Sequence, residues 1–238
     1  MRIVNGDDFG LNEGCSLAIA EALQRGIITN TTMMATGEYF SEAVRLAKAQ
    51  GFTDRIGVHF NLTEGRPLTE EILSVGAFVR DGRFHKEYLS RPRPLTEREE
   101  NAVIRELSAQ VERIADAGIR VRNADSHHYI HTFLYLAPLA ARVCRAYGIT
   151  RVRINRTFST PERPIITEGR IDNAWWREQG FVTTSRFGRL SDISSGAFPD
   201  DTEIMVHPDY DRNGALIDRT CVENGCPAGE MLAVPDYD

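Results

Sequence analysis

The chain begins with the stretch Arg2-Ile-Val-Asn-Gly-Asp-Asp-Phe-Gly10, in which a short apolar run is followed by Asn, Gly and two Asp residues. This pattern predicts a buried strand that runs into a tight loop. Downstream, strand-like stretches alternate with stretches of helical periodicity, which predicts parallel β/α units in either a barrel or a doubly wound sheet. The further strands are expected at 27–34, 55–61, 120–124, 150–154 and 203–207, and the helices at 17–23, 41–47, 96–114 and 134–147.

The composition limits the class of protein. Of 238 residues, 42% are hydrophobic and 26% charged, which is typical of one folded domain over residues 1–238 and excludes a disordered chain. The net charge of −6 argues against nucleic acid or an anionic membrane surface as a partner. No apolar run approaches the ~20 residues that span a bilayer, and the first residues lack the apolar stretch of a signal peptide. Because four cysteines in a chain of this length do not make a disulfide scaffold, the protein is expected to be cytoplasmic.

Residues 66–95 interrupt the alternation of strands and helices. The segment contains Pro67, Gly76, Gly82, Pro92 and Pro94. This concentration of residues that break regular structure predicts an irregular insertion within the single domain.

Polar residues gather at the C-terminal ends of the predicted strands. In barrel enzymes the loops at this end open onto one rim, where the chemistry takes place. The sequence therefore predicts a functional site there, and the candidate residues are Asp7, Asp8, His59, Asp125, His127 and His207.

Adjacent carboxylates are the first candidate feature. Side chains of Asp7 and Asp8 point in different directions, so one can bind a cation while its neighbour reaches a substrate. Two like charges side by side are unfavourable unless a cation or a shared proton compensates them. The alternative is that Asp-Asp beside glycine serves only the turn.

The densest cluster is Asp125-Ser-His-His-Tyr-Ile-His131. On a helical turn His127 and His131 would share a face, whereas on an extended segment His127 and Tyr129 would share one face and His128 the other. Imidazole and carboxylate together favour zinc or a first-row cation that activates water, and Asp125 could orient one imidazole. The alternative is a His-rich surface turn.

The interpretation of several other residues depends on their sequence neighbours. A lone histidine such as His59 is more often packed in a core, but Asn61 and Glu64 add polar groups at the same strand end. His207 precedes a proline that keeps the chain extended, which makes it a candidate proton donor or acceptor. Arg153 alternates with apolar residues as on a half-buried strand, and it could orient a catalytic carboxylate. The aromatic residues Trp175, Trp176 and Phe181 fit either a sugar-stacking platform or a helix packed on the core.

Four motifs together resemble the YdjC-like (ChbG-type) carbohydrate deacetylases. They occur in order between about Arg2 and Asp218, and they are N-G-D-D-F-G (5–10), G-V-H-F-N-L-T-E-G-R-P (57–67), D-S-H-H-Y-I-H (125–131) and E-I-M-V-H-P (203–208). The resemblance implies an α/β fold with a single (β/α) barrel of the glycoside hydrolase/deacetylase type. It also implies removal of the acetyl group from an N-acetylated amino sugar, typically in an oligosaccharide, with one divalent metal ion, magnesium or zinc.

The resemblance also implies roles for individual residues. Asp8, His59 and His127 correspond to the metal ligands, Asp7 to the base and His207 to the proton donor. Residues expected to bind substrate or to support the site are Asn61, Glu64, Asp125, His128, His131 and Arg153.

Two departures from the family pattern stand out. Tyr129 occupies a position where family members usually have histidine. No closing helix of the family kind follows Leu216–Arg219, so the expected barrel is one that could be incomplete or distorted, and contacts in a possible homodimer could differ. Cys221 and Cys226 lack the second cysteine pair of a zinc ribbon.

Two other functions fit the same residues. A metal-dependent phosphoesterase could use the same Asp/His set, although no Gly-rich cradle or Arg/Lys cluster accompanies the motifs. A non-catalytic carbohydrate-binding relative is the other alternative, and the presence of every proposed acid, base and ligand argues against it.

Overall fold

The computed structural model describes residues 2–159, 164–192 and 200–220, so Cys221 and Cys226 lie outside the described residues. Within these ranges seven parallel strands form one sheet in the order β7-β6-β3-β2-β1-β9-β8. The last strand of this sheet in the sequence, β9, pairs with the first, β1, as in a barrel, which confirms the expected (β/α) barrel fold. The strands are β1 (Arg2–Phe9), β2 (Asn30–Met33), β3 (Ile56–Phe60), β6 (Asn123–Ser126), β7 (Arg151–Val152), β8 (Arg186–Arg189) and β9 (Thr202–Val206).

The ring of strands is incomplete between its two edges, β7 and β8. Strand β7 has only two residues, so a regular ladder does not close the barrel. Single hydrogen bonds bridge the gap instead: the Val152 amide donates to the Val182 carbonyl at 3.1 Å, and the Thr157 amide donates to the Phe187 carbonyl at 2.8 Å. The expectation that the barrel could be incomplete is thus confirmed.

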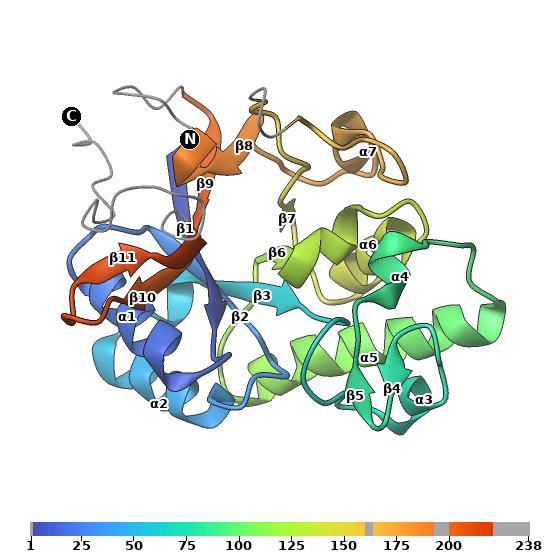
Figure 1. Ribbon diagram of the computed structural model, residues 1–238, viewed down its shortest axis with the longest axis horizontal. Coiled ribbons are helices and arrows are strands. Elements are labelled where there is room, and N and C mark those ends of the chain that lie inside the picture. Colours follow the sequence, from blue (N-terminus) through green and yellow to red (C-terminus); the bar gives the residue numbers. More distant parts are fainter. Residues whose placement is uncertain (1, 160–163, 193–199, 221–238) are drawn as a thin grey trace.

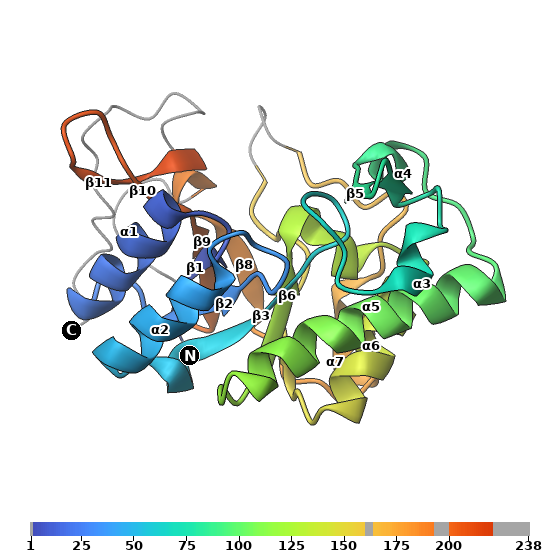
Figure 2. The same cartoon turned by 90° about the horizontal axis from the view of Figure 1, so that it is seen from below.

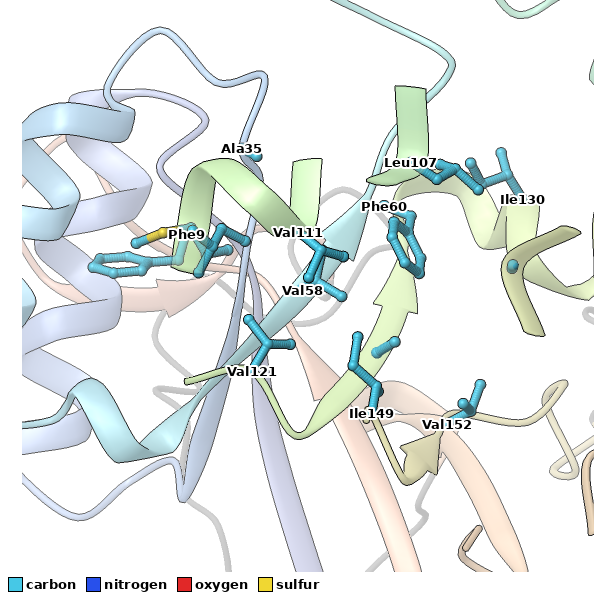
Figure 3. Packing of buried hydrophobic residues seen from close by; sticks show 14 of the residues in the cluster. Phe9, Ala35, Val58, Phe60, Leu107, Val111, Val121, Ile130, Ile149 and Val152 are labelled. Carbon is cyan, nitrogen blue, oxygen red and sulfur yellow. The ribbon is translucent and has the colours of Figure 1, made fainter. Parts of the chain in front are cut away.

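Helices cover the outside of the sheet (Figures 1 and 2). Helix α5 (Glu97–Asp116) begins at the capping box predicted from Thr96 and Glu99, in which the Thr96 amide donates to the Glu99 carboxylate at 2.9 Å. Its residues Leu107 and Val111 pack near Val58 and Phe60 of β3 (Figure 3). The other long helices are α1 (Glu13–Gln24), α2 (Phe40–Gln50) and α6 (Ala137–Ala146).

The insertion at 66–95 is more regular than the sequence predicts. It contains α3 (Glu70–Leu73), the antiparallel pair β4 (Val79–Arg80) and β5 (Arg83–Phe84), and α4 (Glu87–Ser90). The turn between the strands is Asp81-Gly82, with φ of 51° and 71°. Positive φ at both residues is the geometry of a two-residue hairpin turn, and the Asp-Gly pair is a strong sequence signal for it. The prediction of an irregular insertion did not use this signal.

A short helix and a β-hairpin lie late in the chain. Helix α7 (Asn173–Glu178) buries Trp176 completely, at 5.4 Å from the ring of Phe181, so the core-packing interpretation of these aromatic residues is correct. After His207, β10 (Pro208–Tyr210) and β11 (Leu216–Asp218) form a hairpin beside α1. None of the helices in the described ranges is both long and apolar enough to cross a membrane.

Candidate active site

A cleft of about 820 Å³ lies at the C-terminal ends of the strands. The proposed catalytic residues Asp7 and His207 line it, together with the proposed ligands Asp8, His59 and His127. They come from strands far apart in the sequence, and parallel strands bring their C-terminal ends to the same rim. The cleft is therefore the site at which the sequence-predicted residues meet.

The first strand carries both carboxylates and runs into the tight turn that the sequence predicts, in which the Leu11 amide donates to the Asp8 carbonyl at 3.0 Å. Strand β1 continues through Phe9, but its register against β2 shifts between Gly6 and Phe9, and Asp8 has a φ of 73°. In a regular strand, neighbouring side chains face opposite sides of the sheet. This irregularity lets Asp7 and Asp8 both line the cleft, and such irregularities are common beside active sites.

Asp8 faces two imidazole rings. Its Oδ1 atom lies 3.2 Å from His59 Nε2 and 2.8 Å from His127 Nδ1. Neither contact has hydrogen-bond geometry, so this buried oxygen has no hydrogen-bond partner among the described residues. Burial raises the pKa of Asp8, but the two histidines outweigh this effect and hold the pKa well below 3.8.

Each of these rings is held from its far side by a carboxylate. His59 Nδ1 lies 2.7 Å from Asp125 Oδ1, and His127 Nε2 lies 3.1 Å from Glu64 Oε2. A ring nitrogen that donates its proton to a carboxylate leaves the lone pair of the other nitrogen free, in this case toward Asp8. Burial lowers the pKa of His59, but Asp125 and the other acids raise it to about 10, so without a metal ion the ring carries two protons at neutral pH, and a bound ion would take the place of the proton that faces Asp8.

These three residues fit a divalent metal ion. Asp8, His59 and His127 offer one oxygen and two nitrogen atoms that all lie within 4.8 Å of one another. A buried carboxylate oxygen without a hydrogen bond, facing two imidazole lone pairs, requires either a proton or a cation between these atoms. This donor set is typical of zinc and related first-row metal ions.

Arg153 is the centre of a buried ionic network. It donates to Asp7 at 2.6 and 2.7 Å, and it contacts Asp125 at 2.7 Å and Glu203 at 2.6 Å. Burial raises the pKa of Asp7, but Arg153 outweighs this effect and holds the pKa below 3.8. Asp7 is thus an ionised carboxylate with a fixed orientation. The contact agrees with the expectation from the sequence that Arg153 orients a carboxylate.

His207 lines the cleft from the junction of β9 and β10. Its amide donates to Asp218 Oδ1 at 3.2 Å, and its ring Nδ1 lies 3.3 Å from the Thr220 hydroxyl. Thr220 in turn donates to Asp218 at 2.9 Å. The hairpin that follows β9 therefore fixes both the backbone and the ring of His207.

The His-rich segment does not adopt either predicted geometry. Residues His127–Thr132 form a 3₁₀ turn in which His128 and Tyr129 have φ of 56° and 58°. Consequently His127, His128 and Tyr129 all line the cleft, whereas His131 does not share a face with His127. His131 is buried against the Arg153 carbonyl at 3.0 Å, and burial lowers its pKa to about 3.

The remaining predicted residues divide into two groups. Glu64 and His128 line the cleft, whereas Asn61, Asp125, His131 and Arg153 lie behind it. Asn61 accepts hydrogen bonds from the amides of Thr63 and Glu64, at 2.9 and 3.2 Å, and so shapes the loop that carries Glu64.

Sequence reasoning missed two residues of the site. Glu203 lies in the E-I-M-V-H-P motif, and the alternation of side chains along a strand places it on the same face as His207, which was a usable signal. Arg219 lies 3.1 Å from Asp8 Oδ2. This contact depends on the β10–β11 hairpin, for which no motif was recognised.

Comparison with known proteins shows to which family this chain is similar. The model of the YdjC-like protein family matches residues 2–228. A carbohydrate deacetylase of Listeria monocytogenes serotype 4b is 37% identical over 151 residues, which cover 63% of this chain and 60% of that protein. The chain thus spans less than two thirds of the length of that relative. A carbohydrate deacetylase of Brevibacillus brevis is 32% identical over 214 residues, which cover 87% of this chain and 81% of that protein.

A solved structure has the same fold. It is a crystal structure of a protein from Enterococcus faecalis V583, named as a candidate cellobiose-phosphate cleavage protein. The two structures have a TM-score of 0.68 at 25% identity, and the match covers 89% of this chain and 82% of that one. On the match of the family model and the similarity to these relatives, the chain belongs to the YdjC-like protein family.

Proposed function

We propose that this protein hydrolyses the acetamide group of an N-acetylated amino sugar within an oligosaccharide, with one divalent metal ion, zinc or magnesium, held by Asp8, His59 and His127. The observation that carries the proposal is the buried Oδ1 atom of Asp8, which faces two imidazole nitrogens beside the carboxylate of Asp7. The relatives named carbohydrate deacetylases support the choice of substrate class.

The proposed ligands have the supports that metal ligands need. A divalent ion bound there polarises the acetyl carbonyl and a water molecule. Asp125 and Glu64 hold the His59 and His127 rings so that their free nitrogens face Asp8. Arg219 contacts the other oxygen of Asp8, which leaves Oδ1 as the atom directed toward the rings.

Asp7 is the proposed general base. Its lowered pKa keeps it ionised at neutral pH, and its contacts with Arg153 and Asn5 keep it in one orientation. Oδ2 accepts one hydrogen bond among the described residues, from Arg153, so a lone pair remains to take a proton from the attacking water.

His207 is the proposed general acid. The amide nitrogen must gain a proton before it leaves as an amine, because an unprotonated amide nitrogen is a very poor leaving group. His207 lines the same cleft as Asp7 but belongs to a different strand end. Asp7 can therefore accept a proton from the water while His207 gives one to the nitrogen.

One observation favours a second candidate, a metal-dependent phosphoesterase. No Arg/Lys cluster accompanies the motifs in the sequence, but the fold brings Arg83, Lys86, Arg189 and Arg219 to the cleft. Cationic side chains of this kind bind phosphate. Phosphate hydrolysis is therefore tested beside deacetylation.

The test is a measurement of both products with metal-loaded protein. Acetate release and loss of an acetyl group by mass spectrometry are followed over a panel of N-acetylated oligosaccharides, and phosphate release over phosphate monoesters. Deacetylation that disappears in the Asp7→Asn variant supports the proposal. Phosphate release alone favours the second candidate, and saccharide binding without either product favours the non-catalytic alternative.

A further inference from the structure

A second group of potential metal ligands lies on the far side of His127. Glu64 Oε2 is 3.1 Å from His127 Nε2, and the ring centres of His127 and His128 are 4.0 Å apart. The three side chains offer ligand atoms that all lie within 4.8 Å of one another, and all three line the cleft. This group shares only His127 with the proposed site formed by Asp8 and His59.

Hydrogen bonds fix which nitrogen of His128 is free. The Thr63 hydroxyl donates its proton to Asn61 Oδ1 at 3.0 Å, so toward His128 it can only accept. His128 Nδ1, which lies 2.9 Å from that hydroxyl, therefore carries the ring proton. The lone pair of Nε2 remains available to a cation.

The backbone turns to place His128 in the cleft. His128 and Tyr129 are consecutive residues with left-handed φ, a conformation that residues with side chains rarely adopt. Because of this turn, His127 and His128 point into the same cleft although they are adjacent in the sequence. Unfavourable backbone geometry of this kind is found where a functional site requires it.

We propose that Glu64, His127 and His128 form a second site for a zinc-like divalent ion, and that this site binds more weakly than the site at Asp8 and His59. Glu64 and His128 Nε2 hold the ion first. His127 Nε2, 3.1 Å from Glu64 Oε2, is the third ligand: the second ion takes the place of the proton on Nε2, which passes to solvent, and the ring then bridges the two ions as an imidazolate. One carboxylate and imidazole nitrogens are the ligands that zinc prefers.

Two features make this site the weaker one. The Glu64 side chain is 39% exposed, whereas those of Asp8 and His59 are 1% exposed. In addition, the cations Arg83 and Lys86 line the same cleft and repel a divalent ion. The second ion is therefore expected to bind only after the first site is filled.

Occupation of the second site has a consequence for the first. An ion that binds Glu64 removes the carboxylate that orients the His127 ring, and it also occupies the cleft. Excess zinc should therefore inhibit the enzyme, and this consequence rests on the proposed deacetylase function. The number of ions bound does not depend on that function.

The test is zinc stoichiometry by equilibrium dialysis against micromolar to submillimolar zinc chloride, followed by elemental analysis of the protein. His128→Gln and Glu64→Gln should each bind one ion fewer than the wild type. His85→Gln, which removes an exposed histidine outside the cleft, should bind as many as the wild type. Thermal unfolding and circular dichroism verify that each variant is folded, and the second variant serves if one of them is not.

The outcomes separate the two proposals. Equal stoichiometry in the wild type and in both folded variants overturns the second site. A lost ion in His128→Gln with no acetate release in any sample supports the second site while the proposed activity fails. With an active enzyme, zinc beyond one equivalent should inhibit the wild type at least about tenfold more strongly than His128→Gln.

Discussion

Arg153 donates two hydrogen bonds to the carboxylate of Asp7, at 2.6 and 2.7 Å, although 146 positions separate the two residues in the chain. The same guanidinium also contacts Asp125 and Glu203. Asp125 in turn holds His59. One buried arginine thus links the proposed base to a proposed metal ligand.

Replacement of Arg153 should damage both stability and activity. Arg153→Met leaves three carboxylates in the interior without their cation, which is expected to destabilise the fold by about 3–5 kcal/mol. Arg153→Lys retains the charge but cannot contact all three acids, so it should be more stable than Arg153→Met while acetate release remains far below wild type. Urea unfolding and acetate release measure the two effects, and a fully active Arg153→Lys enzyme would argue against a positioning role.

Acid should destabilise the protein through Asp7 and Asp8. Both have a folded-state pKa below the unfolded-state value of 3.8, so the stability that their ionised forms contribute is complete above 3.8 and is lost as the pH falls from there through the lower folded-state pKa. Glu203 contributes to the pH dependence of stability in the opposite direction. Burial raises its pKa, so its protonation favours the folded state as the pH falls. Urea midpoints should therefore fall as the pH is lowered below about 4, and less steeply in Asp7→Asn than in the wild type. Parallel curves for the two proteins would contradict the ionised state of Asp7.

Removal of Arg219 should strengthen metal binding. Its guanidinium lies 3.1 Å from Asp8 Oδ2 and adds positive charge beside the proposed ligands. Since the Arg219 side chain is 32% exposed, solvent screens this charge, and Arg219→Gln should raise zinc affinity by about threefold to tenfold. Calorimetric titration measures the affinity, and Arg212→Gln on the exposed turn of the β10–β11 hairpin is the matched control. Weaker zinc binding in Arg219→Gln would show that Arg219 positions Asp8 more than it repels the ion.

Substitutions of the proposed metal ligands and of the proposed proton-transfer residues should have different effects on metal content. Asp7→Asn and His207→Ala should each lower turnover by at least about a hundredfold while the metal remains bound. His127→Ala should lose both the metal and turnover, because it removes a ligand. Elemental analysis and acetate release on the same samples distinguish the two classes, and loss of metal in Asp7→Asn would transfer Asp7 to the ligand set.

The sequence predicts the site best where one rule of the fold applies. Asp7, Asp8, His59, His127 and His207 lie at the C-terminal ends of strands or directly after them. Parallel strands bring these ends together, so their meeting could be expected without side-chain detail. The orienting contact between Asp125 and His59 follows from the pairing of neighbouring strands β3 and β6.

Other features depend on local geometry or on contacts distant in the sequence. The left-handed residues His128 and Tyr129 decide which histidines face the cleft, and no glycine marks this turn. Arg219 reaches Asp8 because the chain turns back after β9 through the β10–β11 hairpin, which packs beside α1. The Asp81-Gly82 pair, by contrast, is a sequence signal for a two-residue hairpin, but the surrounding prolines favoured the prediction of an irregular segment.

Acetate release by metal-free protein, before and after one equivalent of zinc or magnesium is added, tests the central claim most directly. An N-acetylated oligosaccharide serves as substrate, and Asp7→Asn is measured beside the wild type. The account predicts no release without metal, recovery in the wild type when metal is added, and no recovery in Asp7→Asn although it binds the ion. Full release by the metal-free wild type, or recovery of Asp7→Asn to the wild-type rate, would contradict it.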